Sequence, residues 1–165
     1  MSTNSAHQNR WAIGEVVFGS PFLIAIVLQY LAPAPLPLEI LGPLQRLRLI
    51  AAGIALGVAG VALMLSARRE LARYRQPTDP GAPTTELVRT GPYALSRNPL
   101  YLAAALLFSG VALVLANLWA LGALLLALLL CQTLLILPEE RYLASRFGAD
   151  YAAYVAAVHR WVGRK

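Results

Sequence analysis

The chain alternates between long apolar runs and short polar segments. Residues 16–32 and 49–67 contain no charged side chain, and each run approaches the ~20 apolar residues that cross a hydrocarbon core. A third uncharged stretch covers residues 98–138. As one helix it would be about 60 Å long, roughly twice the core thickness, so we expect it to fold back on itself.

The fold-back is predicted at residues 116–119. Asn117 favours a turn and Trp119 prefers the membrane interface. The predicted spans are therefore residues 16–32, 49–67, 99–116 and 118–137. Residues 68–98 form a cytoplasmic loop, and residues 1–165 form a single domain.

The segment after the last span has a different pattern. Apolar side chains recur there every three or four residues, and Arg146, Asp150 and Arg160 take other faces. This spacing predicts an amphipathic helix over residues 139–162, bent or broken at Gly148, that lies at the interface or packs over the spans. A peripheral anchor without chemistry is the alternative interpretation. The face comprises Leu143, Phe147, Tyr151, Tyr154 and Val158.

These patterns define an all-α fold class, an integral membrane protein with about four transmembrane helices and a C-terminal amphipathic interfacial helix. The composition agrees, because 58% of the 165 residues are hydrophobic and 13% are charged, whereas soluble domains carry about 25% charged residues. Gly53, Gly57 and Gly60 form a small-residue stripe that lets a neighbouring helix approach closely.

The charges indicate orientation and exclude some functions. Basic residues gather between spans two and three and after span four, and the first external loop holds Arg46 and Arg48. The positive-inside rule then places both termini in the cytoplasm, in a multi-pass protein of the inner membrane. A net charge of +6 could indicate a nucleic-acid partner. Basic residues at the ends of apolar segments indicate membrane orientation first, so we expect no nucleic-acid binding. A lone Cys131 and two histidines argue against a metal site.

A cleaved signal peptide is a competing interpretation of the N-terminal segment. Residues 32–34 resemble a cleavage site weakly, but Arg10 and Glu15 fit that pattern poorly. We therefore keep the first apolar run as a span.

Polar side chains cluster at two predicted cytoplasmic helix ends. Asn98 and Pro99 have the character of an N-cap and a first helical residue, and Pro138, Glu139 and Glu140 are also typical of a helix start. Taken separately, each cluster can be explained by helix capping. Ionisable groups at the edge of lipid are costly unless they are paired or used, so together they predict a site for a small, polar, partly cationic ligand.

Three ordered motifs carry a family resemblance. They are residues 87–101, residues 139–143, and residues 147–154 with the final Arg160 and Trp161. The sequence resembles the isoprenylcysteine carboxyl methyltransferase family and its relatives among the phospholipid methyltransferases. The resemblance implies methyl transfer from S-adenosylmethionine to a lipophilic, membrane-embedded acceptor at the cytoplasmic face, with membrane lipids as partners.

The resemblance also implies site residues, carried across by position. Arg97 and Asn98 would be catalytic. The residues that would bind S-adenosylmethionine are Thr85, Glu86, Leu87, Val88, Tyr93, Asn98, Pro99, Tyr101, Glu139 and Glu140.

Two departures from the prenylcysteine enzymes bear on the acceptor. Asn98 stands where the eukaryotic enzymes carry histidine, and residues 134–138 lack their substrate-facing arginine. The acceptor group is therefore a carboxylate, an amine or a thiol, with an amine headgroup at least as plausible as a carboxylate. Two alternatives are an NADPH-dependent membrane reductase of related architecture and a non-enzymatic lipid-binding membrane protein.

Overall fold

The computed structural model describes residues 14–37, 40, 42–76 and 84–165. Arg10 and residues 77–83 of the expected cytoplasmic loop lie outside the described residues. The described chain is helical, with two isolated bridges and no strand among these residues, which confirms the all-α prediction. Its elements are α1 (Gly14–Leu31), α2 (Pro43–Arg73), the 3₁₀ turn η2 (Gly91–Ala94), α3 (Pro99–Leu115), α4 (Leu118–Leu130), the π-helical η3 (Cys131–Ile136) and α5 (Leu137–Ala157).

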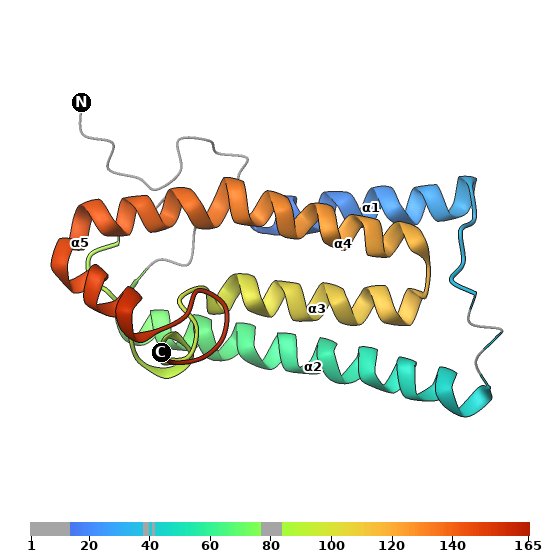
Figure 1. The fold of residues 1–165 in the computed structure, drawn as a ribbon, viewed down its shortest axis with the longest axis horizontal. Coiled ribbons are helices and arrows are strands. Elements are labelled where there is room, and N and C mark those ends of the chain that lie inside the picture. Colours follow the sequence, from blue (N-terminus) through green and yellow to red (C-terminus); the bar gives the residue numbers. More distant parts are fainter. Residues whose placement is uncertain (1–13, 38–39, 41, 77–83) are drawn as a thin grey trace.

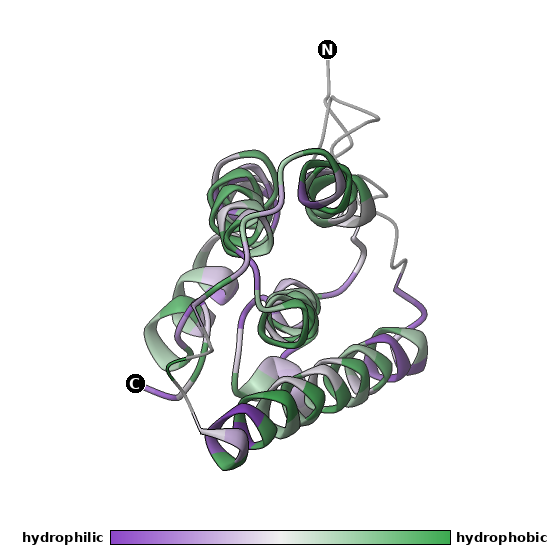
Figure 2. Ribbon diagram, turned by 90° about the vertical axis from the view of Figure 1, so that its right-hand side faces the viewer, coloured by the Kyte–Doolittle hydropathy of each residue, from purple (hydrophilic) through white to green (hydrophobic). Residues whose placement is uncertain are grey.

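Helix α3 lies at the centre of the bundle. It packs on α2 on one side and contacts α1 and α4 on the other (Figures 1 and 2). The middle of α2 is hydrophobic, and its hydrophilic residues gather toward the two ends (Figure 2). Two helical stretches, Pro43–Arg73 and Leu118–Ala157, are long and apolar enough to cross a membrane, and Val16–Leu31 and Pro99–Leu115 are shorter apolar helices. Many large apolar side chains on the outside of the bundle are exposed, as expected where helices face lipid.

The glycine stripe of α2 brings its backbone close to α3. A Cβ built at Gly110 would lie 2.7 Å from the Gly57 nitrogen, and one built at Gly60 would lie 2.7 Å from the Leu107 nitrogen. Such distances leave no room for a side chain, so the two backbones pack directly against each other. The packing role predicted for the stripe is confirmed at Gly53 and Gly60, whereas a Cβ at Gly57 would meet nothing within 4 Å.

The predicted fold-back occurs at Asn117. Ala116 takes a left-handed conformation (φ 48°), and the Asn117 side chain accepts a 2.7 Å hydrogen bond from the Ala120 nitrogen at the start of α4. The Trp119 indole nitrogen donates to the Ala32 carbonyl at 2.8 Å. The turn is thereby tied to the segment that follows α1.

The helical path from α4 to α5 is continuous, so the expected helix start at Pro138 is wrong. The Leu137 nitrogen donates to the Gln132 carbonyl, five residues back, in a π-helical turn. Proline has no N–H and clashes with the carbonyl four residues earlier in an α-helix, and the wider turn absorbs that defect. Glu139 and Glu140 consequently stand inside a long helical path, where the dipole of a helix N-terminus does not explain them.

The C-terminal part of the chain turns back over the loop before α3. Helix α5 bends at Gly148 (φ 48°, ψ −116°) and ends at Ala157 rather than continuing to residue 162. Beyond it, the His159 nitrogen donates to the Gly163 carbonyl at 2.9 Å, and the Gly163 nitrogen donates to the Leu95 carbonyl at 2.7 Å. The expected apolar face is present, because buried Tyr151, Tyr154 and Val158 pack with Leu87, Leu143, Phe147 and Val155.

Candidate functional site

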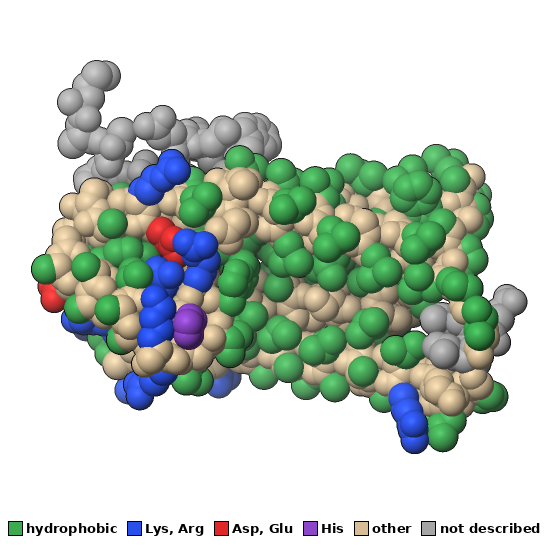
Figure 3. Space-filling model, viewed as in Figure 1, with side chains coloured by type: hydrophobic (Ala, Val, Ile, Leu, Met, Phe, Trp, Pro, Cys, Tyr) green, Lys and Arg blue, Asp and Glu red, His purple; other side chains and the backbone are tan. Residues whose placement is uncertain are grey.

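Charged side chains gather at one end of the bundle (Figure 3). The loop before α3, the beginning of α5 and the C-terminal segment all meet there (Figure 1). Residues far apart in the sequence therefore come together where the membrane-spanning helices end.

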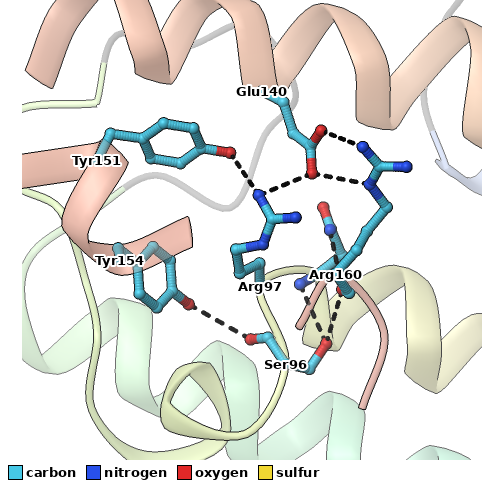
Figure 4. A network of polar contacts seen from close by, with 7 residues as sticks. Ser96, Arg97, Glu140, Tyr151, Tyr154 and Arg160 are labelled. Atoms are coloured by element: carbon cyan, nitrogen blue, oxygen red, sulfur yellow. Dashed lines mark hydrogen bonds and ion pairs between the residues drawn. The ribbon is translucent and has the colours of Figure 1, made fainter. Parts of the chain in front are cut away.

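Glu140 is the centre of an ion-pair network (Figure 4). Arg160 donates to both of its carboxylate oxygens, from Nε at 2.9 Å and from Nη2 at 2.7 Å. Arg97 Nη1 lies 3.1 Å from Glu140 Oε1 and donates to the Tyr151 hydroxyl at 3.3 Å. One carboxylate thus faces two guanidinium groups, and the network carries an excess positive charge. The hydrogen bond to Glu140 raises the pKa of Arg160.

Arg97 is the most enclosed member of this network. Its side chain is 9% exposed, and its Nε is buried with no hydrogen-bond partner among the described residues. An unsatisfied buried donor costs about 1 to 3 kcal/mol, more for a charged group. A bound acceptor group would remove that cost.

Asn98 anchors the C-terminal segment instead of capping α3 with its side chain. Its Nδ2 donates to the Arg160 carbonyl at 3.1 Å, and its backbone nitrogen donates to Ser96 Oγ at 3.1 Å. The Arg97 nitrogen donates to the His159 carbonyl at 3.1 Å. Asn98 still occupies the N-cap position and Pro99 begins the helix, but no side-chain capping bond forms.

Glu139 faces a different partner from its neighbour. The Tyr101 hydroxyl, one turn into α3, donates to Glu139 Oε2 at 3.0 Å. Consecutive residues on a helix point about 100° apart. Glu139 is therefore bonded to a neutral phenol, and Glu140 is bonded to two cations.

Tyr93 lies on the same side of the site as Glu139. Burial raises the pKa of the Tyr93 phenol above its ordinary value near 10, and the charge of Glu139 raises it further. The Tyr93 carbonyl accepts a 2.6 Å hydrogen bond from the Tyr154 hydroxyl. This contact holds η2 against α5.

The remaining predicted cofactor residues, Thr85 to Val88, lie in the loop before α3, and Gln76, just beyond α2, holds the first two of them. Gln76 Oε1 accepts from the Thr85 and Glu86 nitrogens at 2.9 and 3.3 Å. Leu87 packs with the apolar face of α5, and Val88 is buried. These four residues form a loop beside the network, and the hydrogen bonds of Thr85 and Glu86 go to Gln76 rather than to the acidic pair.

Residues 48–150, more than half of the chain, match the phospholipid methyltransferase family. The chain belongs to the phospholipid methyltransferase family. No curated protein and no solved structure matches it. Family membership and the apolar helices together define a membrane methyltransferase in general terms.

The matched part of the chain contains both acidic residues and the Arg97 to Tyr101 motif, but it ends before the C-terminal segment. The site residues missed from sequence are Tyr151, Arg160 and Gln76. Tyr151 had been attributed to an apolar face, and Gln76 carried no motif. The one available signal for Arg160 was its place in the resemblance, because periodicity does not predict that the chain reverses after Ala157.

Proposed function

We propose that this protein transfers a methyl group from S-adenosylmethionine to a lipophilic acceptor embedded in the membrane, at its cytoplasmic face. The observation that carries the proposal is the convergence of the motif residues. Arg97 to Tyr101 from the start of α3 meet Glu139 and Glu140 from α5, in a chain that matches a methyltransferase family.

The charges in the site fit the methyl donor. S-adenosylmethionine carries a sulfonium, an ammonium and a carboxylate. Glu139 is paired with a neutral phenol, so its negative charge suits a cationic group. Arg97 has a buried Nε with no partner among the residues that the structure describes, in a network with excess positive charge, so it suits a carboxylate.

When bound, S-adenosylmethionine supplies an electrophilic methyl group, which bonds to the acceptor's nucleophilic atom while the carbon–sulfur bond breaks and its electron pair stays on sulfur. Arg97, Asn98, Tyr101 and the two glutamates would bind the methyl donor and orient it. Tyr93, Leu87 and Val88 exclude water. No titrating base is needed for the sulfur to leave, because it leaves neutral, and orientation supplies most of the acceleration, up to about 7 to 11 kcal/mol in favourable cases.

An amine headgroup suits the site better than a carboxylate acceptor. Residues 134–137 are leucine and isoleucine, two of them fully buried, and provide no cation for a substrate carboxylate. The second departure, Asn98, keeps hydrogen-bonding capacity without titrating. An amine acceptor must be unprotonated to attack, and it releases its proton to water after transfer.

The charge distribution supports a four-span topology with both termini in the cytoplasm. The basic residues of the α2–α3 connection and the C-terminal segment lie at the end that holds the site, and Arg46 and Arg48 lie at the start of α2. A cysteine placed at Ser145 should resist membrane-impermeant maleimide in intact cells, and one placed at Pro37 should react. The reverse pattern would overturn the orientation.

Calorimetry of the detergent-purified protein tests donor binding. We expect Glu139→Gln and Glu140→Gln to weaken S-adenosylmethionine binding about tenfold or more, because each removes a charge from the site. Asp150→Asn, an exposed acid on the same helix beyond the bend, is the matched control and should bind normally. Unchanged affinity in both glutamate variants, or binding of NADPH in place of the methyl donor, would overturn the assignment.

A labelling experiment tests the acceptor. The protein is incubated with radiolabelled S-adenosylmethionine and either phosphatidylethanolamine vesicles, a prenylated cysteine, or a total lipid extract. Label in the amine lipid supports an amine acceptor, and label in the prenylated cysteine alone contradicts it. Donor binding without label in any lipid fraction would contradict a lipid acceptor.

A further inference from the structure

A second polar region lies beside the candidate site and is separate from its ion-pair network. A hollow of about 340 Å³ is lined by Arg89, Ala94, Ala153, Tyr154, Ala157, Val158, Arg164 and Lys165. Three separate segments form it: the loop before α3, the last turns of α5, and the C-terminal segment. None of Arg97, Glu139 and Glu140 lines it.

Part of the lining of the hollow is cationic. Arg89, Arg164 and Lys165 supply three positive charges, and no carboxylate side chain is among the lining residues. All three side chains are exposed, and Arg164 makes one long hydrogen bond of 3.4 Å from Nε to the Ala94 carbonyl. Their charges are available to an anion.

Apart from Tyr154, the other residues that line the hollow are apolar. Ala153 and Ala157 lie on one face of α5, and buried Val158 follows them. The Tyr154 hydroxyl is already used, since it donates to the Tyr93 carbonyl. The volume equals that of roughly ten water molecules at about 30 Å³ each, which is more than a single inorganic ion needs.

The position of the hollow decides between a soluble and a membrane ligand. The segments that line it belong to the end of the bundle where charged side chains gather at the ends of the long apolar helices (Figures 1 and 3). Basic groups at this level attract the anionic lipids of a membrane leaflet. A lining that combines cationic and apolar residues matches a phosphate joined to glycerol and acyl carbons.

We propose that this hollow binds the headgroup of an anionic phospholipid, with the phosphate between Arg89 and Arg164 and the glycerol over Ala157. The site is independent of methyl transfer and needs no methyl donor. It would dock the C-terminal half of α5 onto the membrane surface.

Binding of dioctanoyl phosphatidylglycerol to the full-length protein in a non-ionic detergent tests the proposal. We expect saturable binding that weakens at high salt. The double variant Arg89→Gln/Arg164→Gln should lose about tenfold or more in affinity. The matched control, Arg46→Gln/Arg48→Gln, removes two exposed arginines at the opposite end of α2 and should bind like the wild type.

Ala157→Leu supplies a variant that keeps every charge. Its larger side chain would occupy part of the hollow and should weaken lipid binding while the protein unfolds at the wild-type temperature. Equal affinity of the wild type and both hollow variants would overturn the proposal, as would equal binding of zwitterionic dioctanoyl phosphatidylcholine. Displacement of the lipid by millimolar inorganic phosphate alone would identify a phosphate site instead of a lipid site.

Discussion

The hydroxyl of Tyr101 lies 3.0 Å from the Glu139 carboxylate and donates a hydrogen bond to it. The two residues belong to α3 and α5, so one contact joins the first turn of the central helix to the helix that carries the acidic pair. Both side chains are partly buried. The bond therefore fixes the direction of a carboxylate that has few alternative partners.

Removing this hydroxyl should loosen Glu139. We expect Tyr101→Phe to keep the ring packing against Val17, Phe18 and their neighbours but to lower the free energy of unfolding by about 1 to 2 kcal/mol, because the carboxylate loses its donor. Affinity for S-adenosylmethionine should fall about tenfold if Glu139 binds its cationic part. Calorimetry and thermal unfolding in detergent measure the two effects.

Tyr30→Phe is the control for this substitution, because Tyr30 is 87% exposed. It should change neither quantity. Normal donor affinity in Tyr101→Phe would show that the bond to Glu139 serves stability alone.

The bidentate contact between Arg160 and Glu140 should hold the C-terminal segment in place. Arg160→Gln removes both donors to the carboxylate. The Arg160 side chain is 36% exposed, so solvent screens the pair and the expected loss is about 1 kcal/mol or less. Hydrogen exchange at the Arg97 and Gly163 amides, which bond across this segment, should accelerate up to about fivefold.

Arg160→Lys separates charge from geometry. A lysine keeps the positive charge but cannot form the two parallel bonds, so exchange should accelerate nearly as much as in Arg160→Gln. Wild-type exchange rates in both variants would show that the bond from the Asn98 side chain to the Arg160 carbonyl and the backbone bond from Gly163 to Leu95 hold the segment unaided.

The helices were predictable because lipid leaves little choice of pattern. A run without charge marks each apolar helix, and Asn117 marks the fold-back because its side chain satisfies an otherwise unpaired amide at the start of α4. Helix ends were less predictable. Helix α2 extends from Pro43 to Arg73, beyond the apolar run, because a helix continues into the polar region while its backbone bonds remain favourable.

The residues that belong to the site were easier to predict than their arrangement in space. The motif identified Arg97 and Glu140 separately, but their 3.1 Å contact depends on the helical path through the π turn before Pro138, and the contact of Arg160 with Glu140 depends on the reversal after Ala157. Both are tertiary features without a local pattern. The helix start assigned to Pro138 failed for the same reason, because the π turn accommodates a proline that local rules place at a helix start.

The close packing of α2 and α3 should be intolerant of any added side chain. A Cβ at Gly110 would lie 2.7 Å from the Gly57 nitrogen and 3.1 Å from its Cα, and backbone atoms cannot rotate away. We expect Gly110→Ala to lower the free energy of unfolding by about 1 to 3 kcal/mol, measured by thermal unfolding in detergent.

Gly122→Ala should instead raise the free energy of unfolding. A Cβ there meets nothing within 4 Å, and alanine is the better helix former by about 1 kcal/mol. A stable Gly110→Ala variant would mean that α2 and α3 can separate at little cost.

Tyr93 should make the protein sensitive to alkaline pH. Burial and the charge of Glu139 raise the pKa of its phenol in the folded state above the ordinary value near 10 that applies when the chain unfolds. Below pH 10 the phenol is neutral in both states and its contribution is fully present. As the pH rises above 10 the unfolded state ionises first, so stability falls until the raised pKa is reached.

Unfolding temperatures measured from pH 8 to pH 11 should therefore decrease at the alkaline end, and they should decrease less in Tyr93→Phe, which has no ionisable group at this position. At pH 8 the two proteins should have similar unfolding temperatures, because neither the phenol of tyrosine nor the phenyl ring of phenylalanine is charged there. Parallel curves for the two proteins across the whole range would show that the Tyr93 phenol ionises as easily in the folded protein as in the unfolded chain, and would place it outside the enclosed part of the site.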